Sequence, residues 1–318
     1  MRGRVRGWAM RHCDAQHPPL PRLGSVPELP EVEALAQDLR RRLVGRAISR
    51  VDLTAFSALK TFDPPLQALH GTLVDDVTRH GKFLDIDASG VHLVIHLARA
   101  GWIRWRDEVP DLPARPNPKN PLAARVVIDD PDLEAQPGLD ITEAGTKKGL
   151  AIYVVRDPQE VEGIARLGPD PLSDDFTIDV LRQILEAEGR KQVKGVMRMQ
   201  SIIAGIGNAY SDEILHAARM SPFKPANSLD ATELQTLYDA VRRTLGDAVQ
   251  RSAGLAASEL KGEKKSNLAV HGRTGQACPV CGDIVREVSF ADSSLQYCAT
   301  CQTGGKPLAD RRMSRLLK

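Results

Sequence analysis

Three features are absent from this chain of 318 residues, and each absence excludes a class of protein. No run of eighteen or more apolar residues occurs, so no helix is predicted to cross a membrane. Residues 1–25 contain no apolar core segment and therefore do not resemble a secretory signal peptide. No internal repeat is found. The length allows two domains, each with a hydrophobic core.

A large excess of charge of one sign is also lacking, because 43 Lys and Arg stand against 41 Asp and Glu. The distribution is uneven: the net charge is +4 over residues 1–25, −9 over 26–189 and +7 over 190–318. A basic C-terminal part fits an anionic polymer such as nucleic acid. A surface that is uneven without functional meaning would give the same counts.

Cysteine is scarce, and four of the five cysteines form one pattern. Cys278-Pro-Val-Cys281 and Cys298-Ala-Thr-Cys301 are close pairs separated by sixteen residues, while Cys13 lies far away. Each pair can direct two thiolates at one ion, and a hairpin would bring the pairs together. Two disulfides are the alternative, but they are typical of small secreted proteins rich in cysteine. The spacing predicts one structural Zn²⁺ in a ribbon that either contacts nucleic acid or only stabilises the fold.

The hydrophobic pattern indicates where elements begin and end. Residues 1–26 have no hydrophobic period and are predicted to be disordered. A helical period follows Pro27 and ends at Gly45, and short β-branched runs continue to residue 157, which indicates a sandwich or barrel. The predicted strands are Ala47–Leu53, Thr72–Val77, Phe83–Ile86, Val91–Leu97, Ile103–Trp105, Arg125–Ile128 and Ala151–Val155. Residues 107–121 are rich in proline and predict a loop.

Residues 158–267 have a helical period instead. The predicted helices are Ile178–Glu188, Val193–Ile203, Ala209–Arg219 and Leu229–Arg251. Residues 252–267 are small and polar and predict a loop, 268–303 hold the zinc ribbon, and 304–318 form a basic tail. The predicted fold class is therefore α+β with several domains: a helix and β-sandwich over 27–157, a helical domain and a zinc ribbon with four cysteine ligands.

Two segments concentrate polar chemistry. Val26–Glu33 (VPELPEVE) holds three carboxylates and two prolines, which an ordinary helix start would also contain. In Gly205-Ile-Gly207, the glycines let backbone N–H groups approach an anion closely, and Asn208 stands where it can cap the next helix. This arrangement predicts a phosphate clamp, although a single Gly-x-Gly turn does not identify a binding site by itself.

Taken together, three motifs resemble the formamidopyrimidine-DNA glycosylase and endonuclease VIII family. They are PELPEVE from Pro27, GIGNxYxDExL from Gly205, and the four cysteines, and they occur in the family's order. The resemblance extends from Pro27 to about Gln302. It implies a β-sandwich with an N-terminal helix, a helix-two-turn-helix domain and a zinc finger, in agreement with the pattern above.

The resemblance implies a bifunctional DNA glycosylase/AP lyase that acts on double-stranded DNA with damaged or abasic sites. In the family, the N-terminal proline is a free secondary amine that attacks C1′ of a flipped-out nucleotide. Pro27 would be this nucleophile, Glu28 the acid that assists base loss and sugar-ring opening, and Glu31 a supporting carboxylate. Lys82 would contact phosphate and assist β-elimination. Asn208, with Gly205 and Gly207, would bind phosphate.

The chain departs from the family at positions that handle the lesion. Arg99 stands where the family often has a methionine that fills the space left by the flipped base, and it could bond the orphan base. Lys147 and Lys148, within Glu143–Leu150, occupy the place of the family's wedge loop. Ser201 stands where enzymes for oxidised guanine have a lysine, and 252–267 is short for a lid. These departures argue against 8-oxoguanine as the specific lesion.

Asp292-Ser293-Ser294 stands where the family's zinc finger has an arginine that clamps phosphate and supports δ-elimination. Its absence predicts a weaker grip on DNA and arrest after β-elimination. The basic tail carries five Lys and Arg against Asp310, and it could replace the lost phosphate contact or remain solvated.

Pro27 is internal in the chain as written, and an internal proline nitrogen is an amide without a nucleophilic lone pair. Val26 precedes it, and GTG encodes valine internally but methionine at a bacterial start, so we expect translation to begin at Val26. Proteolysis after Val26 would expose the same amine. A retained extension would leave a non-catalytic DNA-binding protein of the same fold. We expect a cytoplasmic, nucleoid-associated monomer, since thiolate zinc and the lack of an export signal indicate an intracellular protein.

Overall fold

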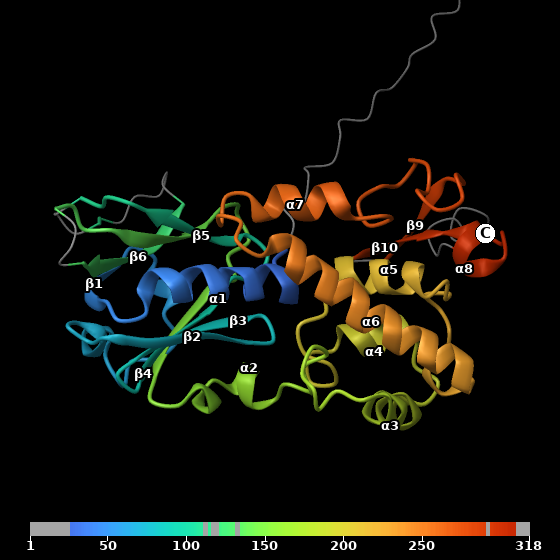
Figure 1. The fold of residues 1–318 in the computed structure, drawn as a ribbon, viewed down its shortest axis with the longest axis horizontal. Helices are drawn as coiled ribbons and strands as arrows, with labels where there is room; N and C mark the ends of the chain where they lie inside the picture. Colours follow the sequence, from blue (N-terminus) through green and yellow to red (C-terminus); the bar gives the residue numbers. More distant parts are fainter. Residues whose placement is uncertain (1–25, 111–113, 116–120, 131–133, 291–292, 310–318) are drawn as a thin grey trace, which may run out of the picture.

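The computed structural model describes residues 26–110, 114–115, 121–130, 134–290 and 293–309. The predicted leader, with Cys13, and most of the basic tail lie outside these residues. Figure 1 shows a β-rich half that holds the N-terminal part of the chain and a helical half beside it. The ribbon with the four cysteines lies at the far end of the helical half.

Helix α1 (Leu29–Leu43) links the two halves (Figure 1). It begins with a capping box in which Glu28 and Glu31 bond each other's backbone N–H groups. Its stripe from Val32 to Leu43 packs into the sandwich core, whereas Leu29 belongs to the core of the helical half. The first turn of α1 therefore lies at the junction of the two halves.

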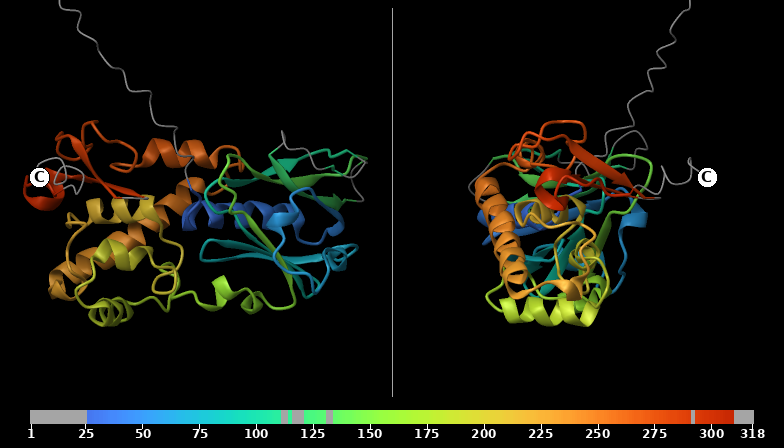
Figure 2. Two further views of the ribbon diagram at one scale, coloured as in Figure 1. Left: turned by 180° about the vertical axis from the view of Figure 1, so that it is seen from behind. Right: turned by 90° about the vertical axis from the view of Figure 1, so that its right-hand side faces the viewer.

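Two antiparallel four-stranded sheets form the sandwich, in the orders β1-β6-β7-β5 and β2-β3-β4-β8. Figure 2 shows the two sheets as separate layers with α1 between them. The strands are β1 (Ala47–Leu53), β2 (Val74–His80), β3 (Phe83–Ala88), β4 (Val91–His96), β5 (Gly101–Arg106), β6 (Leu122–Asp129), β7 (Gly138–Glu143) and β8 (Ala151–Val155).

The sequence pattern predicted seven of these strands, five of them with shifted ends, and missed β7. This strand is buried along its whole length, yet it contains polar residues, so its sequence lacks the apolar run that would predict a buried strand. Asp140 is buried because Arg106 and Arg125 approach its carboxylate at 3.0 and 2.6 Å. These ion pairs hold the pKa of Asp140 below its ordinary value against the opposing effect of burial.

The second half consists of helices joined by short turns. The helices are α2 (Glu162–Ala165), α3 (Ile178–Glu188), α4 (Val193–Arg198), α5 (Asn208–Ala217), α6 (Ala231–Ser252) and α7 (Leu260–Asn267). Four 3₁₀ turns also occur among the described residues: η1 (Phe56–Ala58), η2 (Leu66–Leu69), η3 (Pro158–Glu160) and η4 (Ala226–Ser228).

Two predictions for this half were wrong. The helix predicted over Val193–Ile203 ends at Arg198, because the backbone of the next residue, Met199, is already extended. The loop predicted over 252–267 contains α7. Its inward face pairs one apolar residue, Leu260, with the buried Lys264 one turn later, so the helix shows little hydrophobic period.

The C-terminal ribbon pairs β9 (Val285–Ser289) with β10 (Ser294–Cys298) and ends in α8 (Ala299–Thr303). It packs on the helical half, where the N–H of Gln296 donates to Asp212 at 3.2 Å. The predicted fold class is confirmed. Across the part of the chain that is described, no helix combines the length and apolar character that a membrane crossing needs.

Candidate active site and metal centre

The N-termini of α1 and α5 meet at the carboxylate of Glu28. It accepts hydrogen bonds from the backbone N–H groups of Gly207 at 2.6 Å, Ala209 at 2.9 Å and Tyr210 at 3.2 Å. These donors are the otherwise unpaired groups of the first turn of α5, where the helix dipole favours an anion. Glu28 is 2% exposed, so two segments far apart in sequence are fixed to each other at a buried charge.

The two glycines of the turn make this approach possible. A Cβ on Gly207 would lie 2.4 Å from the Glu28 carboxyl carbon, and one on Gly205 would lie 2.7 Å from Leu29. The N–H of Leu29 also donates to the Gly205 carbonyl at 3.0 Å. The glycines therefore admit the first turn of α1. The phosphate contact predicted for them stays a prediction.

Asn208 is the first residue of α5, and Gly207 is its N-cap. The prediction that Asn208 caps this helix was wrong, because the Glu28 carboxylate takes that role. The Asn208 amide nitrogen donates to the Ser294 carbonyl of the ribbon at 2.8 Å, and its oxygen is buried without a partner among the described residues. Asn208 thus joins the helical half to the ribbon, and its phosphate contact stays a prediction.

Glu31 lies one turn inside α1 and is 1% exposed. Its carboxylate accepts hydrogen bonds from the Glu28 N–H at 2.8 Å, the Tyr210 hydroxyl at 2.8 Å and the Lys264 ammonium at 2.7 Å. Burial raises the pKa of Glu31, while the charge of Lys264 opposes that shift. Glu31 is thus the centre of a buried network that joins α1, α5 and α7.

Lys264 is a site residue that the sequence did not reveal, because it lies in the segment predicted as a loop. Its ammonium is 3.0 Å from the Val26 carbonyl oxygen, 3.9 Å from Glu28 Oε1 and 4.7 Å from the centre of the Tyr210 ring. The residue is 3% exposed. The one available signal was the spacing of Leu260 and Lys264, which places both on one face of a helix.

Pro27 is buried among these groups. Its nitrogen is bonded to the carbonyl carbon of Val26, and the oxygen of that carbonyl accepts from Lys264. Glu28 directly follows Pro27, Glu31 lies in the first turn of α1, and the Lys264 ammonium binds the carbonyl that is attached to the Pro27 nitrogen. Pro27, Glu28 and Glu31 were predicted to share a site, and the structure brings them together.

Lys82 stands in the two-residue turn between β2 and β3, where Gly81 has a φ of +56°. Burial lowers the pKa of Lys82, the nearby Glu28 opposes the shift, and the positive charges of Lys264 and Arg198 add to it. Burial opposes ionisation of Glu28, but Lys264, Lys82 and the backbone donors outweigh it, and the pKa of Glu28 lies below its ordinary value. Lys82 therefore faces the same site.

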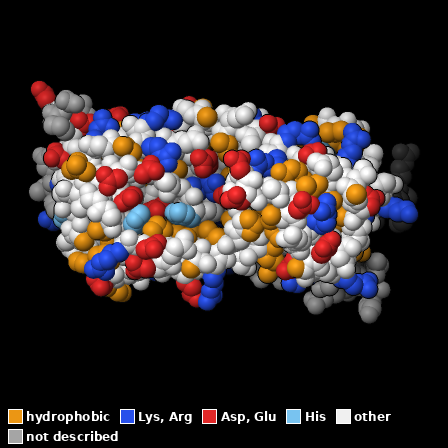
Figure 3. Space-filling model, turned by 60° about the horizontal axis from the view of Figure 1, so that its bottom comes forward, with side chains coloured by type: hydrophobic (Ala, Val, Ile, Leu, Met, Phe, Trp, Pro, Cys, Tyr) orange, Lys and Arg blue, Asp and Glu red, His pale blue; other side chains and the backbone are white. Residues whose placement is uncertain are grey.

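His96, at the end of β4, is also influenced by the positive charge of Lys82. Burial and the nearby Lys82 lower the pKa of His96 to about 4, so its imidazole is neutral at pH 7. Figure 3 shows Lys and Arg side chains near the centre of one face of the molecule, with acidic side chains close by. The described part of this face carries both signs of charge side by side.

Arg99, Lys147 and Lys148 are exposed and lie in two neighbouring loops. The N–H of Ala144, at the start of one loop, donates to the Ala100 carbonyl of the other at 3.2 Å. The Lys148 ammonium donates to the Glu143 carbonyl at 2.7 Å. The three predicted DNA contacts thus lie on one exposed pair of loops, called the exposed rim below, and not among the buried carboxylates. Their contact with DNA stays a prediction.

The four cysteines of the ribbon converge as the spacing predicted. The four sulfurs all lie within 4.8 Å of one another, with Cys281 and Cys298 at 3.3 Å and Cys278 and Cys301 at 3.9 Å. Sulfurs bound tetrahedrally to one Zn²⁺ lie roughly 3.8 Å apart, so the set fits this ion. His216 Nε2 lies 3.3 Å from the Cys278 sulfur, as a hydrogen-bonding neighbour of a ligand would.

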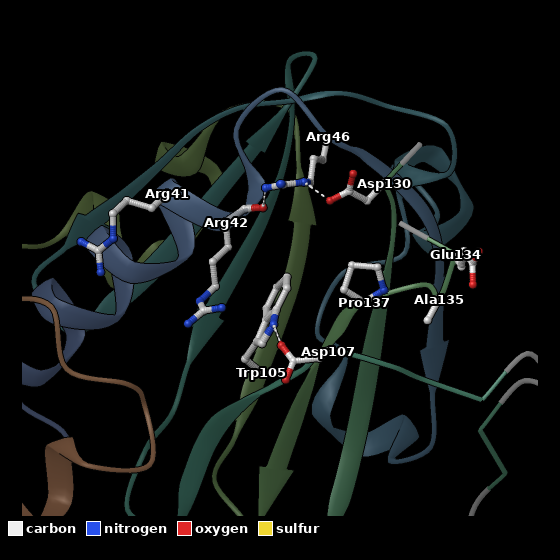
Figure 4. A pocket seen from close by; sticks show the side chains of 9 residues that line it. All are labelled: Arg41, Arg42, Arg46, Trp105, Asp107, Asp130, Glu134, Ala135 and Pro137. Carbon is white, nitrogen blue, oxygen red and sulfur yellow. Dashed lines mark hydrogen bonds and ion pairs between the residues drawn. The ribbon is translucent and has the colours of Figure 1, made fainter. Parts of the chain in front are cut away.

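A separate hollow of about 430 Å³ lies at the opposite end of α1 (Figure 4). Figure 4 shows Arg42 beside the Trp105 ring, 4.9 Å from its centre, and the Trp105 indole bonded to Asp107. Arg46 pairs with Asp130 at 2.6 Å across the hollow. These residues are far from Glu28 along the helix and do not take part in the site described above.

Comparison with known proteins assigns this architecture to a class. The formamidopyrimidine-DNA glycosylase N-terminal domain matches residues 26–135, its H2TH domain matches 167–259, and the zinc finger found in FPG and IleRS matches 275–304. The fold and the site therefore define a helix-two-turn-helix protein with a zinc finger.

Similar proteins match either most of the chain or about half of it. A formamidopyrimidine-DNA glycosylase of Symbiobacterium thermophilum is 34% identical over 298 residues, 90% of this chain and 93% of the relative. An uncharacterized formamidopyrimidine-DNA glycosylase-like protein of Mycobacterium tuberculosis is 60% identical over 152 residues, 48% of this chain and 94% of the relative. The chain belongs to the formamidopyrimidine-DNA glycosylase family.

Solved structures agree. The MutM (Fpg) protein of Thermus thermophilus superposes with a TM-score of 0.72 at 31% identity, covering 88% of this chain and 100% of that one. The Lactococcus lactis enzyme bound non-covalently to DNA with an AP site gives 0.73 at 25% identity, covering 87% and 99%.

Proposed function

We propose that this protein is a bifunctional DNA glycosylase/AP lyase of base excision repair, with the free amine of Pro27 as its nucleophile. The buried Glu28, Glu31 and Lys264, with the part-buried Lys82 that interacts with them, carry this proposal because they adjoin Pro27. The Lactococcus lactis relative bound to abasic-site DNA supports the substrate class. The family match begins at residue 26, which supports a mature chain that begins at Pro27.

The first step forms a bond between the Pro27 nitrogen and C1′ of the damaged nucleotide, while the bond from C1′ to the base breaks and the departing base, which takes the electron pair, picks up a proton from water. The nitrogen then carries a proton that it must lose. Glu28 is suited to accept this proton, because its lowered pKa keeps it ionised at pH 7 and it is the residue next to Pro27 in the chain. Returning the proton to the sugar ring oxygen opens the ring and leaves an iminium, so Glu28 serves first as base and then as acid.

The second step is β-elimination. The iminium makes the C2′ proton acidic, and its removal breaks the bond between C3′ and the 3′ phosphate oxygen. The lowered pKa of Lys82 leaves more of its amine neutral, which suits it to take this proton or to contact the phosphate. Water then hydrolyses the iminium and releases Pro27. Arrest at this stage, without δ-elimination, is part of the proposal.

The zinc ribbon is assigned to holding the DNA-binding surface in shape. One Zn²⁺ on the four cysteines would order β9 and β10, and β10 carries the Ser294 carbonyl that fixes Asn208. Asn208, Arg99, Lys147 and Lys148 are the proposed contacts to double-stranded DNA. We propose a monomer that acts in the cytoplasm on the nucleoid.

Borohydride trapping tests the proposed activity. Two proteins are compared on a duplex with one abasic site: a chain that begins at Pro27 and the full chain of 318 residues. The first is expected to give a covalent complex that survives denaturation, and the second is not, because its Pro27 nitrogen is an amide. If both bind the duplex and neither is trapped, the protein is a non-catalytic DNA-binding member of the family.

A matched variant separates base removal from lyase chemistry. Glu28→Gln keeps the Pro27 amine but cannot carry the proton, so excision of a damaged base is expected to fall at least about a hundredfold. Trapping on a pre-formed abasic site is expected to fall less. Equal losses on both substrates would show that Glu28 acts only by holding α5.

A further inference from the structure

Lys264 makes four contacts in a site that family resemblance did not assign to it. Its ammonium binds Glu31 at 2.7 Å and the Val26 carbonyl at 3.0 Å, lies 3.9 Å from Glu28, and covers the face of Tyr210. We propose that Lys264 is a positioning residue that holds the Pro27 amine in its neutral, nucleophilic form. This inference rests on the proposed function.

Lys264 is held in place by the helix that carries it. The Trp102 indole in the sandwich donates to the Ala257 carbonyl at 2.9 Å, just before α7, and Lys261 lies over the same ring at 4.3 Å. Arg251 at the end of α6 pairs with Glu263 at 2.8 Å. Helix α7 is thereby fixed to both halves of the molecule, and Lys264 is presented to the site by a rigid element.

The hydrogen-bonding roles favour a neutral amine. A lysine ammonium can only donate hydrogen bonds, and a protonated proline amine can also only donate them, so the two cannot bond each other. In the structure the ammonium donates to the carbonyl oxygen next to the Pro27 nitrogen. When Pro27 is the first residue, that oxygen is absent, and the lone pair of the neutral amine is an acceptor beside the same ammonium. Protonated Pro27 would place two positive charges together.

The carboxylates of Glu28 and Glu31 do not reverse the preference for a neutral Pro27 amine. The carboxylate of Glu28 is already occupied by three backbone donors, and that of Glu31 by Lys264 and the Tyr210 hydroxyl. Among the described residues, the titratable and charged groups that act on the site are Glu28 and Glu31 at the start of α1, Lys82 from the β2–β3 turn, His96 from β4, Lys194 and Arg198 from α4, Tyr210 from α5, and Glu263 and Lys264 from α7.

Removal of the Lys264 charge is therefore expected to raise the pKa of the Pro27 amine. Without it, the Glu31 carboxylate loses the cation that is bonded to it directly and would pair with protonated Pro27. The pKa of the Pro27 amine is then expected to rise by about one unit, the size of effect that a single nearby charge has. A rise of that size lowers the neutral fraction about tenfold at pH values below both pKa values.

The test compares chains that begin at Pro27 and carry Lys264, Lys264→Met or Lys264→Arg. Single-turnover trapping on abasic duplex is measured against pH with cyanoborohydride as the reductant. For Lys264→Met, we expect the rising limb to move up by about one pH unit and the rate at high pH to recover to within about twofold of wild type. Lys264→Arg is expected to restore the wild-type profile. A Lys264→Met profile that is lowered at every pH without moving would contradict the inference.

A second readout does not depend on activity. Titration of the Pro27 nitrogen by NMR in protein labelled with ¹⁵N-proline gives the pKa of the amine directly, and zinc content and thermal melting verify folding. Equal pKa values in wild type and Lys264→Met would overturn the inference even if trapping occurs. If wild type binds abasic DNA but is not trapped at any pH, the proposed function fails, and the titration still decides the role of Lys264.

Discussion

The carboxylate of Glu28 lies 2.6 Å from the backbone nitrogen of Gly207, although 179 positions separate the two residues in the sequence. This hydrogen bond joins the first turn of the N-terminal helix to the start of α5. It places the proposed nucleophile, Pro27, at the junction of the two halves. This hydrogen bond depends on the absence of a side chain at position 207, so a methyl group added there would disrupt it.

Gly207→Ala tests this junction. A Cβ would lie 2.4 Å from the Glu28 carboxyl carbon, so either the carboxylate or the turn must move. We expect the free energy of unfolding to fall by about 2–3 kcal/mol and the trapping rate to fall with it. Urea denaturation measures the first. Gly246→Ala on α6 is the matched control, because its Cβ would meet open space, and that change is expected to stabilise the protein slightly.

His96 predicts a pH dependence of stability. The folded-state pKa of His96 is lowered to about 4, below the ordinary value of 6.5, so the unfolded chain binds the proton more tightly. The corresponding stability is present above pH 6.5 and is lost as the pH falls toward 4. We expect wild type to lose about 2–3 kcal/mol more than His96→Gln between pH 7 and pH 4. Parallel urea titrations at the two pH values would contradict this if the losses were equal.

The metal centre predicts a coupling between zinc and DNA binding. Cys298→Ala, or removal of zinc by a chelator, is expected to unfold the ribbon, release Asn208 from Ser294, and weaken binding of an abasic duplex at least about tenfold. Fluorescence anisotropy measures the binding, and elemental analysis is expected to give one zinc per chain. Val280→Ala, at an exposed position between two of the ligand cysteines, is the control and is expected to leave both unchanged. Binding that survives metal loss would contradict the role given to the ribbon.

The exposed rim predicts two different kinds of DNA contact. Lys147→Ala is expected to weaken binding of all duplexes alike and to reduce the slope of log affinity against log salt by about 1, as the loss of a phosphate contact would. Arg99→Ala is expected to change the preference for the base opposite the abasic site instead. Fluorescence anisotropy measures the affinity of each variant over a salt series, for duplexes with each of the four bases opposite the abasic site. Identical changes in affinity for the two variants would contradict the two kinds of contact.

Much of the fold was predictable because its elements follow simple patterns. The stripe of α1, the run of short strands and the cysteine spacing each report a local requirement of packing or metal geometry. Strand β7 and helix α7 were missed for one physical reason. Both bury charged side chains, Asp140 and Lys264, whose ion-pair partners come from elsewhere in the chain, so a hydrophobic pattern cannot show them.

The candidate site was predictable only in part. Pro27, Glu28 and Glu31 came from one contiguous motif, and the structure gathers them with the neighbouring Lys82. Capping of α5 was assigned to Asn208 because its own side chain is a good cap, whereas the cap in the structure is the distant Glu28. A contact across the junction between the halves depends on tertiary structure, and so does the arrival of Lys264 from α7.

The most direct test of the central claim is the intact mass of the protein from its native cells after borohydride treatment with abasic duplex. The account predicts a chain that begins at Pro27 and whose mass is increased by that of the 5′ part of the cleaved strand, joined through its sugar. A chain that retains residues before Pro27 and carries no adduct would contradict the assignment of Pro27 as the nucleophile.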